Sequence, residues 1–240
     1  AHLACFTVTK YERTLAVKLE MPIYGCDPEL FDIGNKSNSR KIFRQCGLQV
    51  PAGFEDLKNE EEIVTALTDL KLNNPKLRKA VVKMNDGFSG EGNAVFSYEG
   101  IDEGSDWKQW ITENLATRLK IVAGDLSFKD FMFKFQHMQG IVEEFVMGDI
   151  KTSPSVQCRI NPLGDCKVIS THDQLVGGES GQVFIGANFP ANADYAIEIG
   201  EFGLRVAEAL QKQGVMGRFA VDFISVKEPD GWKHYAIEIN

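Results

Sequence analysis

The chain has 240 residues, of which 34 are acidic and 26 basic, so its net charge at pH 7 is −8. A hydrophobic fraction of 43% is typical of a folded globular protein and excludes a disordered or collagen-like chain. The acidic balance argues against nonspecific binding to nucleic acid or to an anionic membrane surface. The sequence contains no run of about 18 consecutive apolar residues, so it predicts no transmembrane helix.

The five cysteines and four histidines are scattered along the chain. None has the CxxC, HExxH or HxxxH spacing that is typical of metal or disulfide sites. The odd cysteine count and the missing CxxC spacing argue against a disulfide framework and favour a reducing compartment, so we expect a cytoplasmic protein. The sequence begins at Ala1 without a methionine and ends at Asn240 inside an expected strand. We therefore expect an excised piece of a longer parent chain.

The N-terminal segment, residues 1–33, alternates short apolar runs with one helical pattern. A strand is expected at residues 3–7, a helix over Tyr11–Leu19, and a second strand at residues 21–25 before a Pro/Asp turn. This strand–helix–strand order predicts the end of an α/β layer.

Two helices are expected next, over Asn35–Cys46 and Glu60–Leu72. Gly47 follows the first helix in the usual position of a C-terminal cap. Four basic residues crowd one broad face of that helix: Lys36, Arg40, Lys41 and Arg44. Such a helix start can meet phosphate, whereas a run of this kind is more often a solvated face, which we favour for Arg44.

A hairpin is predicted from the strand Ala80–Met84, a turn, and the returning strand Asn93–Tyr98. Lys83 lies in the middle of the first apolar strand, where a buried lysine is costly unless it pairs with an anion. The turn after it is rich in glycine: Asn85, Asp86, Gly87, Phe88, Ser89, Gly90, Glu91 and Gly92.

A lysine directly before a glycine-rich turn can hold one anion between its ammonium and the backbone N–H groups of the turn. This arrangement predicts a phosphate cradle. The spacing is not that of a Walker A loop, of GxGxxG, or of the protein-kinase order, in which the loop precedes the lysine. The alternative is an edge-strand lysine that points to water beside an ordinary hairpin.

A helix is then expected over Trp107–Leu119, followed by a strand over Gly140–Val146 that bends at Gly148. This strand carries two adjacent acids near its end, in the order Glu143, Glu144, Phe145, Val146. Such a segment could form a hinge whose backbone pairs with a nucleotide base. An ordinary edge strand would show the same pattern.

The C-terminal part predicts two strands, a glycine-rich loop, the longest helix and a final hairpin. Their expected ranges are 155–161, 165–176, 177–190, Ala193–Gln213, Phe219–Val226 and Trp232–Asn240. In the final hairpin, Glu238 and Asn240 are two residues apart and share a face, and the pairing can bring Asp222 alongside. Two carboxylates and an amide oxygen suit Mg²⁺, although a solvated polar face is the alternative.

Taken together and in this order, these segments resemble the ATP-grasp superfamily. Their amino-acid sequences are similar to those of the pheganomycin-type peptide ligases. The similar stretches are 34–41, 82–93, 171–174 and 236–240. The resemblance implies an α+β fold in which two subdomains grip ATP between antiparallel sheets. The domains would be residues 1–33, the remnant of an N-terminal α/β layer; 34–145, with the glycine-rich loop; and 146–240, with the metal site, truncated at its end.

The resemblance also implies roles for individual residues. Lys36 and Lys83 would hold phosphates, and the turn from Asp86 to Gly92 would fold over them. The segment 143–146 would hold adenine, with Glu143 at its amino group and Val146 pairing through the backbone. Mg²⁺ would be bound by Asp222, Glu238 and Asn240.

Arg159 is expected to hold a carboxylate bidentately and to act with Lys83 in catalysis. His172 and Asp173 are expected to line the acceptor side. Arg218 lies just before the expected strand that carries Asp222. It could take part in the site or could equally be a surface charge.

The implied reaction is the ATP-dependent joining of a small-molecule carboxylate to an amine, an amino acid or peptide, through an acyl phosphate. It needs positioning and charge neutralisation more than a protein nucleophile. Two alternatives remain. One is a non-catalytic nucleotide-binding domain that serves as a scaffold in a larger protein. The other is a kinase-like phosphotransferase, which the absence of HRD- and DFG-type segments disfavours.

Overall fold

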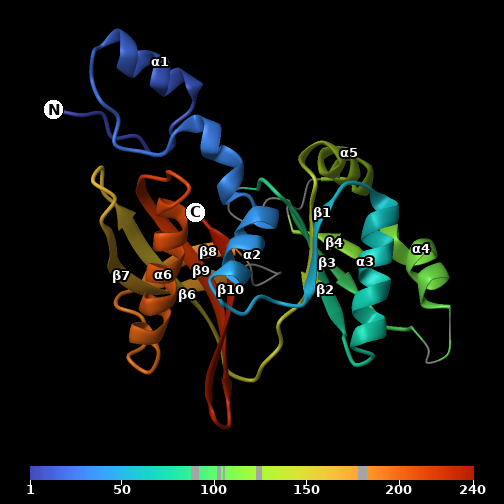
Figure 1. Ribbon diagram of the computed structural model, residues 1–240. Helices are drawn as coiled ribbons and strands as arrows, with labels where there is room; N and C mark the ends of the chain where they lie inside the picture. The colour runs from blue at the N-terminus through green and yellow to red at the C-terminus, as the bar shows by residue number, and fades with distance from the viewer. Residues whose placement is uncertain (88–91, 102–103, 105, 123–125, 178–182) are drawn as a thin grey trace. The chain divides into compact units, whose positions relative to one another are not determined.

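The computed structural model describes the chain except for residues 88–91, 102–103, 105, 123–125 and 178–182. The chain forms two compact units (Figure 1). Unit 1 comprises Ala1–Gln49, Ile150–Gln174 and Ala187–Asn240, and unit 2 comprises Val50–Asp149 and Leu175–Gly186. The α+β class predicted from the sequence is confirmed, whereas the division of the chain at residues 33 and 145 stays a prediction.

The sheet of unit 2 has five strands in the order β1-β5-β2-β3-β4, and neighbouring strands are antiparallel. The strands are β1 Gly53–Leu57, β2 Lys79–Met84, β3 Asn93–Ser97, β4 Leu119–Ile121 and β5 Gly140–Glu144. The predicted hairpin is confirmed as β2 and β3, with Lys83 opposite Asn93.

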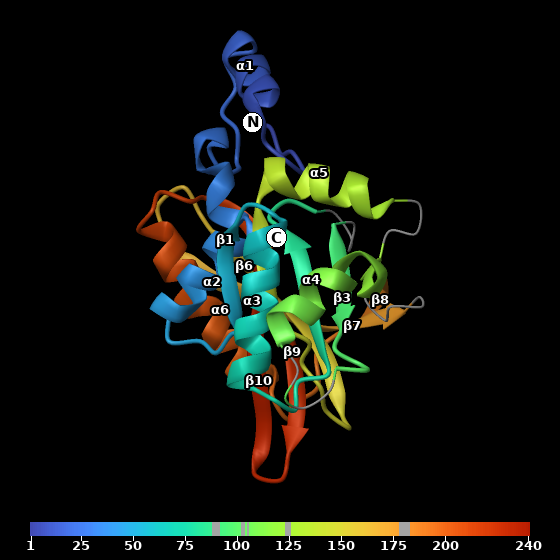
Figure 2. The same ribbon diagram turned by 90° about the vertical axis from the view of Figure 1, so that its right-hand side faces the viewer.

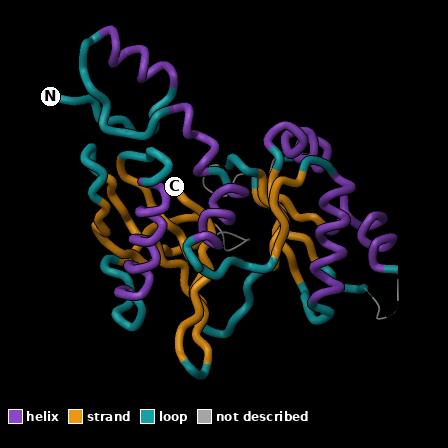
Figure 3. Tube along the Cα trace, viewed as in Figure 1, coloured by secondary structure: helices purple, strands orange, loops and turns teal. Residues whose placement is uncertain are grey.

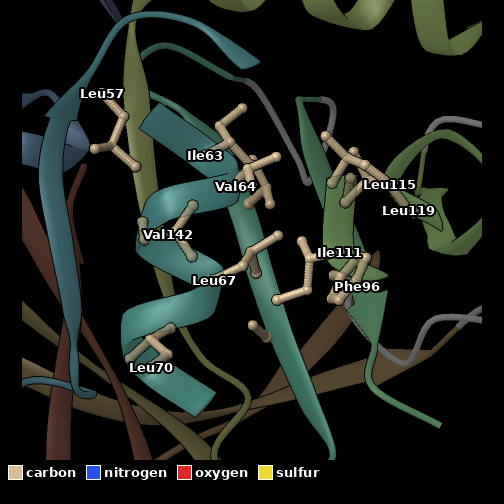
Figure 4. Close-up of a cluster of buried hydrophobic side chains, with 14 of the residues drawn as sticks. Leu57, Ile63, Val64, Leu67, Leu70, Phe96, Ile111, Leu115, Leu119 and Val142 are labelled. Atoms are coloured by element: carbon tan, nitrogen blue, oxygen red, sulfur yellow. The ribbon is translucent and has the colours of Figure 1, made fainter. Parts of the chain in front are cut away.

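Helices cover one face of this sheet (Figure 3). They are α3 Glu60–Asn73, α4 Trp107–Arg118 and α5 Phe128–Met138. Val82 of β2 and Val142 of β5 lie in a core with Ile63 and Leu67 of α3. Figure 4 shows Val142 beside Ile63 and Leu67 in this core. Because strand residues alternate between faces, Lys83 lies on the face opposite this core.

The second sheet also has five strands, in the order β10-β9-β6-β7-β8. They are β6 Lys151–Ile160, β7 Cys166–Gly177, β8 Val183–Asn188, β9 Gly217–Glu228 and β10 Gly231–Ile239. The antiparallel hairpin of β9 and β10 was predicted and is confirmed. The prediction of a continuous loop over 177–190 is wrong, because residues 183–188 form the edge strand β8.

Unit 1 also holds α1 Lys10–Lys18, a short 3₁₀ helix Pro28–Gly34, α2 Lys36–Gln45 and α6 Ala196–Gln211. Figure 2 shows α1 apart from the sheet of the same unit. The predicted strands at 3–7 and 21–25 are wrong: only one parallel bridge joins Leu3 to Ile23. Two backbone hydrogen bonds complete that bridge, which is too short a ladder to define a strand.

Helix α6 packs closely on β6, and two glycines in it give a matched pair of predictions. A Cβ at Gly203 would lie 2.6 Å from Val156 Cγ1, whereas a Cβ at Gly200 would meet nothing nearer than Val168 Cγ1 at 3.9 Å. We expect Gly203→Ala to destabilise the protein by about 1–3 kcal/mol through overpacking. Gly200→Ala should stabilise it by about 0.5–1 kcal/mol through helix propensity.

Denaturant unfolding of the two single variants measures both effects. Equal free energies of unfolding for the two variants would contradict this close packing of α6 on β6.

In the part of the chain that the structure describes, no helix is long and apolar enough to cross a membrane.

Candidate functional site

Lys83 is buried in unit 2 and paired with an acid. Its side chain is 8% exposed, that of Glu143 is 3% exposed, and Lys83 Nζ lies 2.7 Å from Glu143 Oε1. The register explains the contact, because Glu143 lies opposite Val81, two residues before Lys83 on the same face. Lys83 is therefore not a solvent-facing edge lysine.

The turn after Lys83 is closed at its base. Met84 N donates to Gly92 O over 2.9 Å, and Gly92 has φ of 92°, a conformation that favours glycine. Asp86 and Gly87 are exposed at the start of the turn. Phe88, Ser89, Gly90 and Glu91, which the sequence predicts to fold over phosphate, lie outside the described residues.

The segment 143–146 is tied to both neighbouring strands of its sheet. The backbone and side chain of Glu144 both bond Ala52, with Glu144 Oε1 accepting from Ala52 N over 3.1 Å. The Nζ of Lys79 lies 6.0 Å from the ring centre of Phe145, and Val146 is buried. Glu143 already holds Lys83, so its role at an adenine amino group stays a prediction, as does that of Val146.

In unit 1, the three predicted metal ligands lie together. Asp222 of β9 is directly opposite Glu238 of β10, and Asn240 Nδ2 donates to Asp222 Oδ2 over 2.8 Å. A β-bulge between Ala236 and Glu238 sets this register. The amide nitrogen of Asn240 makes the bond to Asp222, which leaves its amide oxygen to face a cation.

The electrostatics of this group fit a divalent cation. The pKa of Asp222 is raised to about 6, chiefly by burial and also by the nearby Glu238 carboxylate, while hydrogen bonds from Ser155, Gln174 and Asn240 act in the opposite direction. Carboxylates directly opposite each other on neighbouring strands repel. A hard cation would relieve this repulsion, and carboxylate and amide oxygens are the ligands that Mg²⁺ prefers.

Among the described residues, no group of three or more His, Cys, Asp or Glu side chains could hold a metal ion. The candidate site has two acids and one amide, and its binding of Mg²⁺ stays a prediction.

Lys36 lies beside these carboxylates in unit 1. It is the first residue of α2, Asn35 caps the helix, and Lys36 Nζ lies 3.1 Å from Glu238 Oε2. The prediction of a solvated basic face is confirmed for Arg44, which is exposed. Arg40, for which the sequence left the two interpretations open, is fully buried.

The second sheet has two distinct faces. Helix α6 covers one of them, the helix face, on which Val156, Val221 and Phe223 are buried. The other, which we call the site face, carries a row of four polar residues on four neighbouring strands. In the order β7, β6, β9 and β10, this row is His172, Ser155, Asp222 and Glu238.

The structure separates His172 from Asp173, because successive strand residues point to opposite faces. His172 lies on the site face, and its ring centre is 5.3 Å from that of Phe189. Asp173 lies on the helix face, where its carboxylate accepts hydrogen bonds from Tyr195 Oη over 2.5 Å and from Asn192 N over 2.8 Å. The two residues therefore do not line one surface.

Sequence reasoning missed Ser155 and Gln174, which both donate to Asp222. The signal was available in the alternation of β6, where Ser155 and Arg159 share a face four residues apart. Arg159 lies on the site face, and its Nε is buried without a hydrogen-bond partner.

The chain carries a buried lysine before a glycine-rich turn in one unit and a carboxylate–amide set on an antiparallel sheet in the other, as the resemblance to ATP-grasp proteins implies. The chain belongs to the IQCH-like ATP-grasp family, whose model matches residues 29–120 and 108–239. The resemblance read from the sequence is therefore confirmed.

Two curated proteins are similar to this chain. The L-propargylglycine–L-glutamate ligase of Streptantibioticus cattleyicolor is 30% identical over 210 residues, covering 86% of this chain and 40% of that protein. The IQ motif-containing protein H of Danio rerio is 22% identical over 257 residues, covering 94% of this chain and 24% of that protein. The chain thus spans less than half the length of either relative.

Solved structures share the fold. One is the biotin carboxylase domain of the Hydrogenobacter thermophilus 2-oxoglutarate carboxylase, in complex with MgADP and bicarbonate. It is 15% identical with a TM-score of 0.65, and the match covers 95% of this chain and 44% of that one. At this level of identity, the likeness concerns the fold alone.

Proposed function

We propose that this chain is the ATP-grasp domain of an ATP- and Mg²⁺-dependent ligase that joins a carboxylate to an amine. The observation that carries the proposal is the presence of two complementary sets of residues: the buried Lys83 before the glycine-rich turn, and the oxygen ligands Asp222, Glu238 and Asn240. The similarity to an amino-acid ligase over 86% of the chain supports the type of bond.

In this proposal the two sets serve one reaction. Asp222, Glu238 and Asn240 would hold Mg²⁺, which when bound neutralises charge on phosphate oxygens. Lys83 would supply a further positive charge to a phosphate, and Glu143 would keep its ammonium in place. Lys36 shares Glu238 with the proposed metal site, so its ammonium would turn to a phosphate when that carboxylate binds the cation.

The substrates would be a small carboxylic acid and a small amine, as in an amino acid or peptide. An oxygen of the carboxylate attacks the γ-phosphorus of ATP, and the bond from that phosphorus to ADP breaks. The amine nitrogen then attacks the acyl carbon, phosphate leaves, and the nitrogen loses a proton to give the amide. Arg159 would hold a substrate carboxylate, and no protein nucleophile is required.

A non-catalytic nucleotide-binding domain is the second candidate. It is favoured by one specific observation: the family model that matches the chain is IQCH-like, and a relative that covers 94% of the chain is named for its IQ motif rather than for a reaction.

The proposal is tested on the complete protein with MgATP and a mixture of amino acids, measuring ADP, free phosphate and amide products by mass spectrometry. We expect equal amounts of all three, lost in Glu238→Gln because one oxygen ligand then loses its charge. The matched control is Glu228→Gln, an exposed acid at the end of β9.

No ADP above the Glu238→Gln level would reject the ligase, and retained ATP binding would then favour the non-catalytic candidate. Phosphate left on the acceptor would instead indicate a phosphotransferase.

A further inference from the structure

Three cations lie side by side on the site face of unit 1. Arg159 of β6 is directly opposite Lys167 of β7 and directly opposite Arg218 of β9. Opposite residues on antiparallel strands have their Cβ atoms about 5 Å apart, so the three side chains start as neighbours. We call this set the basic row.

The basic row shares its face with the proposed metal ligands. In the uninterrupted pairing of β6 with β9, Ser155 lies opposite Asp222 and Arg159 lies opposite Arg218, four residues further along. An even separation keeps all four side chains on one face. The intervening residues Cys158 and Phe219 are buried on the helix face.

No carboxylate neutralises the basic row within the described residues. Arg159 Nε is buried without any hydrogen-bond partner, which leaves a costly unsatisfied donor. Two other buried cations do have a carboxylate partner: Lys36 pairs with Glu238, and Lys83 pairs with Glu143. The chain has a net charge of −8, so acidic residues are plentiful, yet among the described residues none pairs with these three adjacent cations. The basic row therefore lacks an anionic partner.

Like charges directly opposite each other destabilise a sheet. The basic row thus has a cost, which an anion between the side chains would remove. Arginine offers a planar pair of donors that matches a carboxylate, and charge-assisted bonds of this kind are among the strongest in proteins.

The position of the basic row decides which anion it serves. Four residues along a strand span about 13 Å, so the row is too far from Asp222 and Glu238 to hold the group that reacts there. The anion must lie several bonds away on the same molecule.

We propose that the basic row binds a second carboxylate of the substrate, remote from its reacting carboxylate. The substrate class is then an acid whose second carboxylate lies far along the molecule from the first, such as a peptide with a free carboxylate. Arg159 holds the second carboxylate, and the exposed side chains of Lys167 and Arg218 add positive charge on either side of it. This inference rests on the proposed function for the reaction, but the anion site can be tested without it.

The test is calorimetric titration of the complete protein, without nucleotide, using three probes: glutarate, its neutral diamide glutaramide, and 4-phosphonobutyrate. We expect glutarate to bind more tightly than glutaramide, because the carboxylate charge is what the row recognises. Arg159→Gln and Arg218→Gln should each weaken glutarate binding at least about tenfold. Arg159→Lys should retain part of it.

Arg205→Gln is the matched control, because Arg205 is an exposed arginine of α6, stacked 5.1 Å from the ring centre of Phe202. It should bind glutarate like the unaltered protein. Arg218→Gln and Lys167→Gln alter exposed residues, so they test the row even if Arg159→Gln folds poorly. Their thermal midpoints should stay equal or rise, whereas a purely structural role would lower them.

Equal binding of glutarate and glutaramide, or unchanged binding of glutarate in Arg159→Gln, would overturn the inference. Tighter binding of 4-phosphonobutyrate than of glutarate would overturn the assignment to a carboxylate and indicate a phosphate-bearing substrate. MgATP binding is titrated separately. Its absence would reject the proposed function, while the nucleotide-free anion titration would still decide the basic row.

Discussion

Lys83→Met is expected to destabilise the protein by roughly 3–5 kcal/mol and to abolish nucleotide binding. Lys83 and Glu143 form a buried ion pair at 2.7 Å, with side chains 8% and 3% exposed. Removing only the lysine leaves the Glu143 carboxylate buried without this partner, and that is the costly outcome. The same change removes the ammonium proposed to bind phosphate.

A double variant separates the two effects of this change. In Lys83→Met with Glu143→Leu, both charges are replaced by apolar groups of similar size, which in other buried pairs is often neutral for stability. We expect the double variant to regain most of the free energy of unfolding and still to bind no nucleotide.

Lys79→Met is the matched control, because Lys79 lies in the same strand but is exposed. It should change stability by no more than about 0.5 kcal/mol. Urea unfolding measures the free energy of unfolding of each variant, and ATP calorimetry measures its nucleotide binding. If Lys83→Met bound MgATP normally, the phosphate role of Lys83 would be wrong.

The second large effect is expected for Asp222→Asn, which should lower ADP formation by about a hundredfold or more. Asn keeps the shape of Asp and one of its two acceptor oxygens, but it removes one of the two opposed carboxylates proposed to hold Mg²⁺. Because Asp222 lies opposite Glu238, the change also removes a like-charge repulsion. Stability should therefore be unchanged or slightly higher while activity is lost.

Asp230→Asn is the matched control, since Asp230 is an exposed acid in the turn between β9 and β10. The measurements are ADP release by the complete protein and the rise of the thermal midpoint on adding Mg²⁺ with ATP. A Mg²⁺-dependent rise that persists in Asp222→Asn would contradict the assignment of the metal ligands.

If removing a functional carboxylate makes the protein more stable, the site held two carboxylates that repel each other in the folded state. Natural proteins commonly keep such sites at a cost in stability, because the function requires charges that the fold alone would avoid. The basic row follows the same logic with the opposite sign. Neutralising one of its cations should cost binding and leave the fold as stable or more so.

Helix positions were largely predictable from the sequence because their signals are local. Asn35 and Asn59 cap α2 and α3, and Gly47 follows α2 with φ of 72°. Helix α5 was missed, although apolar side chains recur at Phe128, Phe131, Met132 and Phe135 in the helical period. Strand β8 was missed because its glycine-rich surroundings favour a loop.

By itself, the sequence determined which chemical groups the site can offer. The lysine before a glycine-rich turn is visible from order and spacing, and so is the alternation that places Glu238 and Asn240 on one face. The hairpin alone did not determine the register, because continuing the pairing from its turn would place Asp222 opposite Ile237. The β-bulge between Ala236 and Glu238 shifts the pairing and sets Asp222 opposite Glu238.

Only the tertiary structure decided the partners of these groups. The pairing of Lys83 with Glu143 depends on β5 lying next to β2, although 59 residues separate the lysine from the glutamate along the chain. The basic row likewise depends on β6 lying between β7 and β9. Alternation along one strand is a local property, whereas the choice of neighbouring strand is set by the packing of the whole sheet.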